Sequence, residues 1–301
     1  MTQRILTLFT ALTLALVGCA SAQSITDMTG REIVLDAPAQ RVIALNPADC
    51  EILYAIGAQE VLVGRGEYCN YPEEALDLPS VNSGAETNVE QILALEPDVI
   101  VMSKMAQTVE QVEALEAAGV RVVVSDAQSI EGTYDAIALI GALVGREDEA
   151  SMLIAQMQDG FAALSEQSEE VGKTVYFEVS PLEWGLWTAG ADTFLDEIAQ
   201  VCGLQNAFED VSGWAEISQE QVLARDPDYI VTTSVDLGQG LSPEAEIMAR
   251  TGWESLKAVE NANVFSIGAD ESSRPGPRLL EAAEALWRLV YAGEAQQPAA
   301  D

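Results

Sequence analysis

Short apolar runs rich in β-branched residues alternate along the chain with segments whose apolar positions recur at helical spacing. The runs predict strands at 41–45, 98–102, 120–124, 174–178, 229–233 and 263–267. The intervening pattern predicts helices at 49–57, 89–96, 107–118, 192–202, 219–225 and 279–291. This alternation is typical of an α/β fold with parallel sheets, and it occurs once in each half of the chain. We therefore predict two Rossmann-like lobes.

An internal repeat supports this division. The segment NVEQILALEPDVIVM, from Asn88, and the segment SQEQVLARDPDYIVT, from Ser218, are identical at eight of fifteen positions. Each begins with a residue that favours a helix N-cap, has Gln three positions later as in a capping box, and ends its helix at Pro-Asp before an apolar strand. The repeat predicts the same helix–strand unit once in each lobe.

A helical stretch over 131–170 connects the predicted lobes, which cover 24–130 and 171–301. Gly145 is predicted to break this stretch into two segments. The apolar positions on one face of the second segment are Leu153, Met157, Phe161 and Leu164. We interpret this stripe as core packing. A helix in place of a Gly/Ser-rich linker predicts a stiff connection between the lobes.

The N-terminus has the features of an export signal over residues 1–22. Arg4 precedes an apolar region, and Ala20-Ser21-Ala22 forms a small-residue cleavage site. A second interpretation is a lipoprotein signal that ends before Cys19, which would then carry a lipid anchor. We favour the soluble form, because the strand-like segment at 32–35 begins too soon after Cys19 for a long tether. Both interpretations place the mature protein outside the cytoplasm.

Charge and composition exclude several classes of function. The sequence has 14 Lys and Arg against 49 Asp and Glu, and its formal net charge is −35. Binding to nucleic acid is therefore unfavourable, and the acidic residues are interpreted as a solubilising surface. The chain has no His, which removes the usual ligand of zinc or manganese and the usual general base. We find no nucleophile–base pair and no Gly-rich phosphate loop, so an enzyme is not expected.

The cysteines leave one question open. Cys50, Cys69 and Cys202 remain if Cys19 is removed or lipidated, and this odd number leaves at least one thiol unpaired in a monomer. The sequence does not decide whether Cys50 and Cys69 form a disulfide.

Several blocks of sequence carry a resemblance to a known family. In order they are ITDMTGREIVLDAPAQRVIALNPADCEILYAIGA, LVG, YCNYPEEALDLPSV, NVEQILALEPDVIV, WTAGADTFLDEIAQVCGLQNAF, WAEISQEQVLARDPDYIV and SRPGPRLLEAAEAL. Over essentially the whole mature chain, the sequence resembles the periplasmic cobalamin and iron-siderophore binding proteins of ABC importers. The resemblance implies two lobes joined by one long, rigid helix. It also implies a monomeric receptor without a resident cofactor, which captures a corrinoid such as cobalamin or a ferric siderophore.

The resemblance also implies partners and the residues that meet them. Such receptors dock onto arginines of a permease dimer, which works with its ATPase subunits, through one acidic residue of each lobe. The matching residues here are Glu90 and Glu220, at equivalent positions of the repeat. Each is predicted to lie in the first turn of a helix, where the helix dipole favours a carboxylate.

We expect the ligand in the cleft between the lobes, at the carboxyl ends of the strands. The candidate ligand-binding residues are Asn46, Pro47, Tyr68, Tyr71, Trp187, Trp214, Asp270 and Arg274. Trp214 is the preferred candidate because it precedes the Ser218 helix cap, in a loop that matches the cleft wall of the family. Only Arg274 and nearby Arg278 provide positive charge, so a neutral or weakly charged chelate is expected. A haem ligand bound through Tyr68 or Tyr71 is the alternative.

Overall fold

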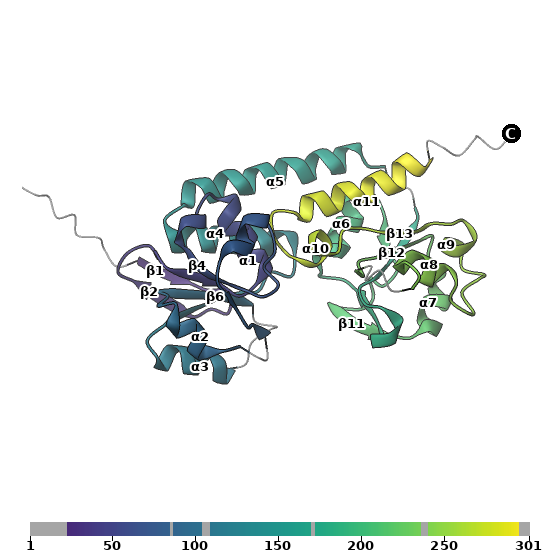
Figure 1. Cartoon of the computed structure of the whole chain (residues 1–301). Helices are drawn as coiled ribbons and strands as arrows, with labels where there is room; N and C mark the ends of the chain where they lie inside the picture. The colour runs from purple at the N-terminus through teal and green to yellow at the C-terminus, as the bar shows by residue number, and fades with distance from the viewer. Residues whose placement is uncertain (1–22, 85–86, 104–108, 170–171, 236–239, 295–301) are drawn as a thin grey trace, which may run out of the picture.

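The computed structural model describes residues 23–84, 87–103, 109–169, 172–235 and 240–294. The predicted signal segment and Cys19 lie outside these residues. Two lobes sit side by side, and one long helix, α5, runs along both of them (Figure 1). The predicted α/β fold with two lobes is confirmed.

The N-terminal lobe is built on a five-stranded sheet in the order β5-β4-β3-β6-β7, and all its strands are parallel. Its strands are β3 (Val42–Ala44), β4 (Leu62–Gly66), β5 (Ser80–Val81), β6 (Val99–Ser103) and β7 (Arg121–Ser125). An antiparallel hairpin, β1 (Gln23–Thr26) and β2 (Glu32–Leu35), precedes the sheet. The helices of this lobe are α1 (Pro47–Ala55), α2 (Val89–Ala94), α3 (Val109–Ala117) and α4 (Ile130–Val144), with short 3-10 turns at η1 (Gln59–Val61) and η2 (Glu73–Asp77).

The C-terminal lobe contains a mixed sheet in the order β11-β9-β8-β12-β13, with β10 beside β8. Its strands are β8 (Thr174–Glu178), β9 (Leu186–Ala189), β10 (Gln205–Asn206), β11 (Trp214–Ile217), β12 (Tyr229–Thr232) and β13 (Val264–Ser266). Its helices are α6 (Phe194–Val201), α7 (Gln219–Arg225), α8 (Pro243–Met248), α9 (Lys257–Glu260), α10 (Ala269–Ser273) and α11 (Leu279–Glu294), with a 3-10 turn at η4 (Leu182–Trp184).

The expectation of a parallel sheet in the C-terminal lobe needs a correction. Strands β8, β12 and β13 are parallel, as predicted, but β9 runs antiparallel to both β8 and β11. The reason is the short connection from β8 to β9, which turns the chain back through η4. Antiparallel neighbours need only a tight turn, whereas parallel ones need a crossover of a dozen or more residues.

The helical stretch between the lobes consists of two helices, α4 and α5 (Glu147–Gln167). The predicted break at Gly145 is present, because this residue ends α4 in the left-handed conformation with φ of 70°. Helix α4 packs on α1 of the N-terminal lobe, whereas α5 continues to α6 and α11 of the C-terminal lobe. The chain crosses between the lobes along α5, which is straight and uninterrupted (Figure 1).

The apolar core continues across the lobe boundary. One buried cluster includes Val42 of the first sheet, Val175 of the second sheet, and Met157, Phe161 and Leu164 of α5. This confirms the core role predicted for the apolar stripe of this helix. Two smaller clusters fill the opposite faces of the sheets, one beneath α2 and α3 and one in the C-terminal lobe. The two lobes therefore share a core, which disfavours large relative motion.

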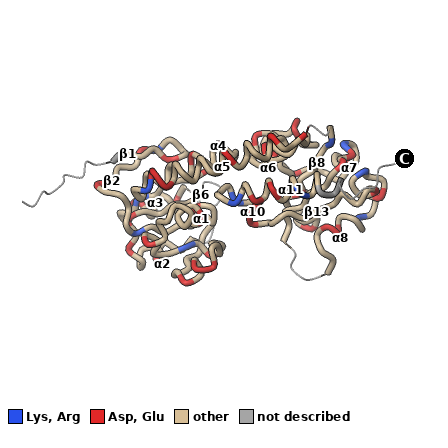
Figure 2. Tube along the Cα trace, turned by 90° about the horizontal axis from the view of Figure 1, so that it is seen from above, with Lys and Arg blue, Asp and Glu red and all other residues tan. Residues whose placement is uncertain are grey.

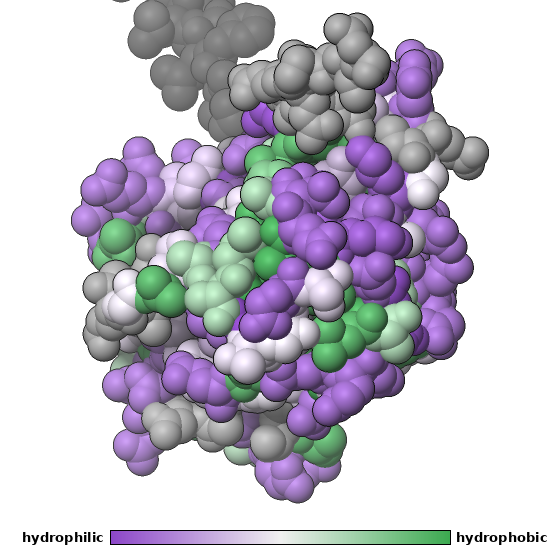
Figure 3. Space-filling model, turned by 90° about the vertical axis from the view of Figure 1, so that its right-hand side faces the viewer, coloured by the Kyte–Doolittle hydropathy of each residue, from purple (hydrophilic) through white to green (hydrophobic). Residues whose placement is uncertain are grey.

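Charged residues cover the surface of both lobes. Acidic positions are distributed along the whole molecule, and basic positions occur where the lobes meet beside α10 (Figure 2). At the far end of the C-terminal lobe, apolar residues form patches between hydrophilic ones (Figure 3). In the part of the chain that the structure describes, no helix has the length and apolar character needed to cross a membrane.

The side chain of Asp27 links the N-terminal hairpin to the first sheet through hydrogen bonds. Its buried carboxylate accepts hydrogen bonds from the backbone N–H groups of Thr29, Arg31 and Val124 at 3.0–3.2 Å. It also accepts bonds from the Thr29 hydroxyl and the Arg31 guanidinium. Burial raises the pKa of Asp27, but these hydrogen bonds outweigh burial and hold the pKa below its ordinary value of 3.8.

Asp27→Asn should lower the free energy of unfolding at about pH 7 by about 2–4 kcal/mol, because a buried charge-assisted network loses its acceptor. A lowered carboxyl pKa stabilises the fold above the pKa of the unfolded chain, and this stability is lost as pH falls through the folded pKa. The difference between variant and wild type should therefore shrink below about pH 4. Urea unfolding at both pH values measures it, with Asp36→Asn as the exposed control. Equal effects of the two substitutions would contradict this role.

Candidate functional site

A hollow of about 360 Å³ lies between the lobes, at the carboxyl ends of the central strands. The N-terminal lobe contributes residues that end or follow β3, β6 and β7, namely Asn46, Ser103, Ser125, Asp126, Ala127 and Gln128. The C-terminal lobe contributes Val179, Phe194, Trp214, Thr233, Ser272, Ser273 and Pro275. The carboxyl edges of open α/β sheets are where such folds bind their ligands. This hollow is therefore the candidate ligand site, and it is called the cleft below.

One wall of the cleft is aromatic. Trp214 stands at the start of β11 and packs against Phe194 with ring centroids 5.1 Å apart. Its indole Nε1 donates a hydrogen bond of 3.0 Å to Gln128 Oε1, so the ring is held by a residue of the opposite lobe. The side chain remains partly exposed to the hollow. A ring fixed in this way offers a flat apolar face at little entropic cost.

Small polar groups share the lining with these rings, and no described lining residue carries positive charge. Hydroxyl groups of Ser103, Ser125 and Thr233 and the side-chain amide of Asn46 are small neutral hydrogen-bonding groups. Among the described residues that line the cleft, Asp126 is the only charged one, and none is basic. The described lining therefore favours a neutral or weakly charged ligand with scattered polar groups and disfavours a strongly anionic one.

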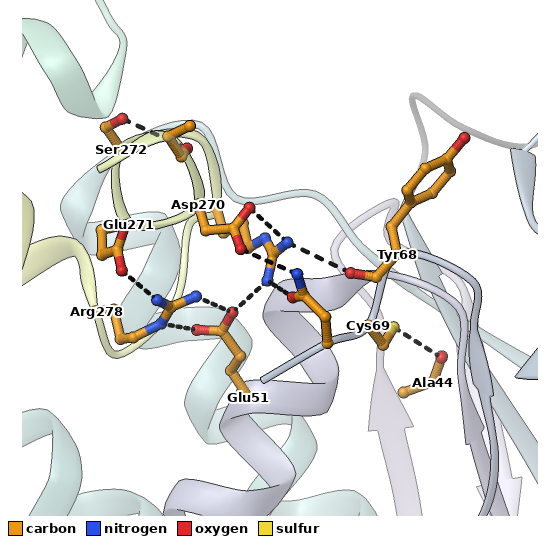
Figure 4. Close-up of polar contacts among 11 residues, drawn as sticks. Ala44, Glu51, Tyr68, Cys69, Asp270, Glu271, Ser272 and Arg278 are labelled. Atoms are coloured by element: carbon orange, nitrogen blue, oxygen red, sulfur yellow. Dashed lines mark hydrogen bonds and ion pairs between the residues drawn. The ribbon is translucent and has the colours of Figure 1, made fainter. Parts of the chain in front are cut away.

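A buried ion network beside the cleft joins the lobes (Figure 4). Glu51 of α1 is 3% exposed and accepts hydrogen bonds from two arginines of the C-terminal lobe. Arg274 Nη1 lies 2.9 Å from its Oε1, and Arg278 donates through Nη2 at 2.7 Å and Nε at 2.8 Å. The hydrogen bonds to Glu51 raise the pKa of Arg278.

The loop after β4 completes this network. Arg274 also donates to Asn70 Oδ1 at 2.7 Å and to the carbonyl oxygen of Tyr68 at 3.4 Å, and it pairs with Asp270 at 2.7 Å. The ring of Tyr71 lies beneath the Arg278 guanidinium, whose central carbon is 4.0 Å from the ring centroid. The network is therefore anchored on α1 and this loop in one lobe, and on α10 and the start of α11 in the other.

The structure separates the predicted ligand residues into groups. Asn46 and Trp214 line the cleft, and Pro47 is the first residue of α1 beside Asn46. The residues that belong to the interlobe network are Tyr68, Tyr71, Asp270 and Arg274. Trp187 lies on β9 and is 39% exposed, outside the set of residues that line the cleft.

The three described cysteines form no disulfide in this structure. Cys50, Cys69 and Cys202 are free and buried. The Cys69 thiol donates to the Ala44 carbonyl at 3.5 Å (Figure 4). A hydrogen bond with Cys50, together with burial, raises the pKa of Cys69. These cysteines therefore pack as small buried groups.

The two predicted docking acids occupy equivalent places in the lobes. Glu90 and Glu220 are exposed and lie in the first turns of α2 and α7, whose N-caps are Asn88 and Ser218. Hydrogen bonds from its own backbone and from Ser218 lower the pKa of Glu220. Helices α2 and α7 lie on the side of the molecule away from α5, one on each lobe, and β11 is on that same side (Figure 1).

Comparison with known proteins agrees with this geometry. Residues 42–271 match the periplasmic binding protein family. The chain belongs to this family.

A Bacillus subtilis ABC transporter substrate-binding lipoprotein, YvrC, is 31% identical over 275 residues, which cover 89% of this chain and 85% of that protein. The vitamin B12-binding protein of Salmonella choleraesuis is 31% identical over 252 residues, covering 82% of this chain and 89% of that protein. The crystal structure of the periplasmic vitamin B12 binding protein BtuF of Vibrio cholerae superposes with a TM-score of 0.70 at 27% identity, covering 86% of this chain and 99% of that one. Members of this family are substrate-binding proteins of importers and not enzymes.

The sequence did not single out most of the polar residues of the cleft. Ser103, Ser125 and Thr233 each stand at the end of a strand that the sequence predicts, and that position was the available signal. Small hydroxyl residues are common in loops, so their type alone did not mark them. Ser272 and Ser273 belong to α10, a five-residue helix that the periodicity does not show.

Glu51→Gln should lower the free energy of unfolding by about 3–5 kcal/mol, because two buried arginines would lose their shared carboxylate. Glu284→Gln is the matched control, since Glu284 pairs with Arg288 on the exposed face of α11 and should contribute less than about 0.5 kcal/mol. Urea unfolding of the two variants measures the difference. A Glu51 variant as stable as the Glu284 variant would show that the network does not hold the lobes together.

Proposed function

We propose that this periplasmic binding protein captures a weakly charged metal chelate, a corrinoid above all, in the cleft and delivers it to the permease of an ABC importer. The observation that carries the choice of ligand is the lining of the cleft. The ring of Trp214 lines the cleft together with neutral hydroxyl and amide groups, and no described lining residue is basic. A corrinoid offers a broad apolar macrocycle with many peripheral amides, which suits such a lining.

The relatives support the same class of ligand. The Salmonella and Vibrio proteins are named for vitamin B12, and both match over most of their length. A ferric hydroxamate siderophore, which carries little net charge, would also suit the lining. A tris-catecholate complex would meet Asp126 and a strongly acidic protein without a described basic side chain in the cleft.

A haem ligand has less support from the described residues. One face of the Tyr71 ring lies against the Arg278 guanidinium of the interlobe network. Tyr68 is 68% exposed, and its side chain points away from the interlobe network (Figure 4). Neither tyrosine is among the described residues that line the cleft, so neither is placed to supply an axial ligand there.

Delivery is proposed to use Glu90 and Glu220. Both carboxylates are exposed, and each belongs to the first turn of a helix, where backbone N–H groups favour an anion. An exposed carboxylate can accept a bidentate hydrogen bond from an arginine of a partner protein. One acid on each lobe suits a permease made of two similar subunits, because each lobe can then meet one subunit.

Trp214→Ala should weaken the binding of cyanocobalamin by about 1–3 kcal/mol, since an aromatic face held against the ligand is lost. Tryptophan fluorescence of the wild type should also be quenched on binding. Trp184→Ala is the control, because Trp184 is 69% exposed and is not among the residues that line the cleft. Unchanged affinity in a folded Trp214 variant would remove this residue from the site.

Reversing Glu90 or Glu220 to Arg should leave ligand affinity within about threefold but reduce uptake and stimulation of the importer's ATPase, because like charges would then meet at the interface. The double variant should be more defective than either single one. Glu166→Arg on α5 serves as the control, since it changes the same charge on the opposite side of the molecule. Wild-type uptake by the double variant would refute the docking assignment.

A further inference from the structure

Asp49 is a buried carboxyl group without a partner. It lies in the first turn of α1, is 0% exposed, and neither of its oxygens has a hydrogen-bond partner. Buried polar groups in native proteins are almost always hydrogen-bonded, because an unpaired one costs free energy. The free-energy cost of leaving this acid unpaired therefore has to be offset by a structural or functional role.

The neighbours of Asp49 connect it to the cleft. Burial raises the pKa of Asp49 to about 7, and the side chains near enough to oppose this effect are those of Ser125 and Asn46. They approach the carboxyl group without reaching hydrogen-bond geometry. Both residues line the cleft. The carboxyl group is therefore positioned directly behind two polar groups of the cleft floor.

Asn46 is not committed to capping its helix. As the N-cap residue of α1, it would ordinarily accept a hydrogen bond from the backbone of the first turn. Its side chain makes no such bond, whereas Asn88, at the N-cap of α2, accepts from the backbone N–H of Gln91 at 3.1 Å. The amide of Asn46 is therefore free to turn its oxygen or its nitrogen toward Asp49.

Other titratable groups do not supply a cation to this carboxyl group. Those on the elements around it are Cys50, Glu51 and Tyr54 on α1, Arg65 on β4, Cys69 after β4, Asp126 after β7, Glu131, Tyr134 and Asp135 on α4, Asp270, Glu271 and Arg274 on or beside α10, and Arg278 before α11. Arg274 is paired with Glu51 and Asp270, Arg278 is paired with Glu51 and Glu271, and Arg65 donates to the carbonyl oxygens of Gly66 and Glu67. The charge of the Asp49 carboxylate is therefore neutralised by binding a proton and not balanced by a salt-bridge partner.

We propose that Asp49 is a positioning residue for the ligand, whose protonation state sets which hydrogen-bonding atoms Asn46 and Ser125 present to the cleft. The ionised carboxylate accepts from Asn46 Nδ2 and from the Ser125 hydroxyl, so Asn46 Oδ1 faces the cleft as an acceptor. The neutral acid donates to Asn46 Oδ1 instead, and the amide nitrogen then faces the cleft as a donor. This inference rests on the proposed function of the cleft.

The two states select different ligand groups. With Asp49 ionised, the floor favours the N–H groups of a ligand amide. With Asp49 protonated, it favours carbonyl or carboxylate acceptors. Asp49→Asn removes the titration while keeping the size of the side chain, and Asp135→Asn, an exposed residue of α4, is the matched control.

The first test needs no ligand. In ¹⁵N-labelled protein, the side-chain amide signals of Asn46, assigned with an Asn46→Ser variant, should titrate with a midpoint near the pKa of about 7. The titration should disappear in Asp49→Asn and persist in Asp135→Asn. Asn46 signals that do not change with pH, or that titrate in the Asp49 variant as in the wild type, would overturn the proposal.

The second test measures cyanocobalamin binding between about pH 5.5 and about pH 8.5. Wild-type affinity should change with pH by roughly three- to tenfold, the effect of exchanging about one hydrogen bond, and the Asp49→Asn profile should be flat. The same slope in both proteins would overturn the role in binding. If cyanocobalamin does not bind at any pH, the proposed corrinoid ligand fails, while the Asn46 titration still decides whether Asp49 controls the cleft floor.

Discussion

Burial of the Glu51 carboxylate between two arginines of the other lobe is the constraint on which the arrangement of this protein depends. Removing three charges from water is costly, and only well-aligned hydrogen bonds offset that cost. Bonds of 2.7–2.9 Å from Arg274 and Arg278 satisfy this requirement only when α1 and the start of α11 hold one relative position. The network therefore fixes the relative position of the lobes. Its net contribution to stability is small while it is intact, although removing one partner is costly.

The other features of the molecule follow from that fixed arrangement. Helix α5 and the continuous apolar core oppose sliding of the lobes, while the ion network fixes the side that carries α1 and α10. The cleft is consequently formed before the ligand arrives, with Trp214 already bonded to Gln128 across it. A preformed cleft lowers the entropic cost of capture. The same rigidity fixes the separation of Glu90 and Glu220, which a receptor needs if both are to meet one permease.

Local sequence patterns were enough to predict much of this fold. The strands with continuous apolar runs, the two copies of the capped helix, and the break at Gly145 all depend on neighbours in sequence. Strand β4 was missed because Gly64, Arg65 and Gly66 interrupt its apolar pattern. The second glycine is required there, since a Cβ would lie 2.4 Å from the carbonyl oxygen of Leu45.

The parts that could not be predicted depend on contacts between distant segments. Arg274 was predicted to contact the ligand, but it pairs with Glu51, which lies 223 positions away. Nothing in the local sequence distinguishes Glu51 from other acidic residues of a helix. Asp49 is likewise unremarkable in sequence, and only burial distinguishes it. The end of a predicted strand indicates the edge where a ligand binds. Which residues meet across the lobes depends on contacts between distant segments, such as those of Arg274 with Glu51 and of Trp214 with Gln128.

A fixed cleft without a described basic residue is proposed to select a chelate of low charge. The most direct measurement is equilibrium titration of the purified protein with cyanocobalamin, dicyanocobinamide, ferrioxamine B, haem and ferric enterobactin, at low and at physiological ionic strength. We predict that a corrinoid binds most tightly and that its affinity changes by less than about threefold with salt. Tightest binding by ferric enterobactin, with an affinity that falls steeply as salt increases, would contradict the account.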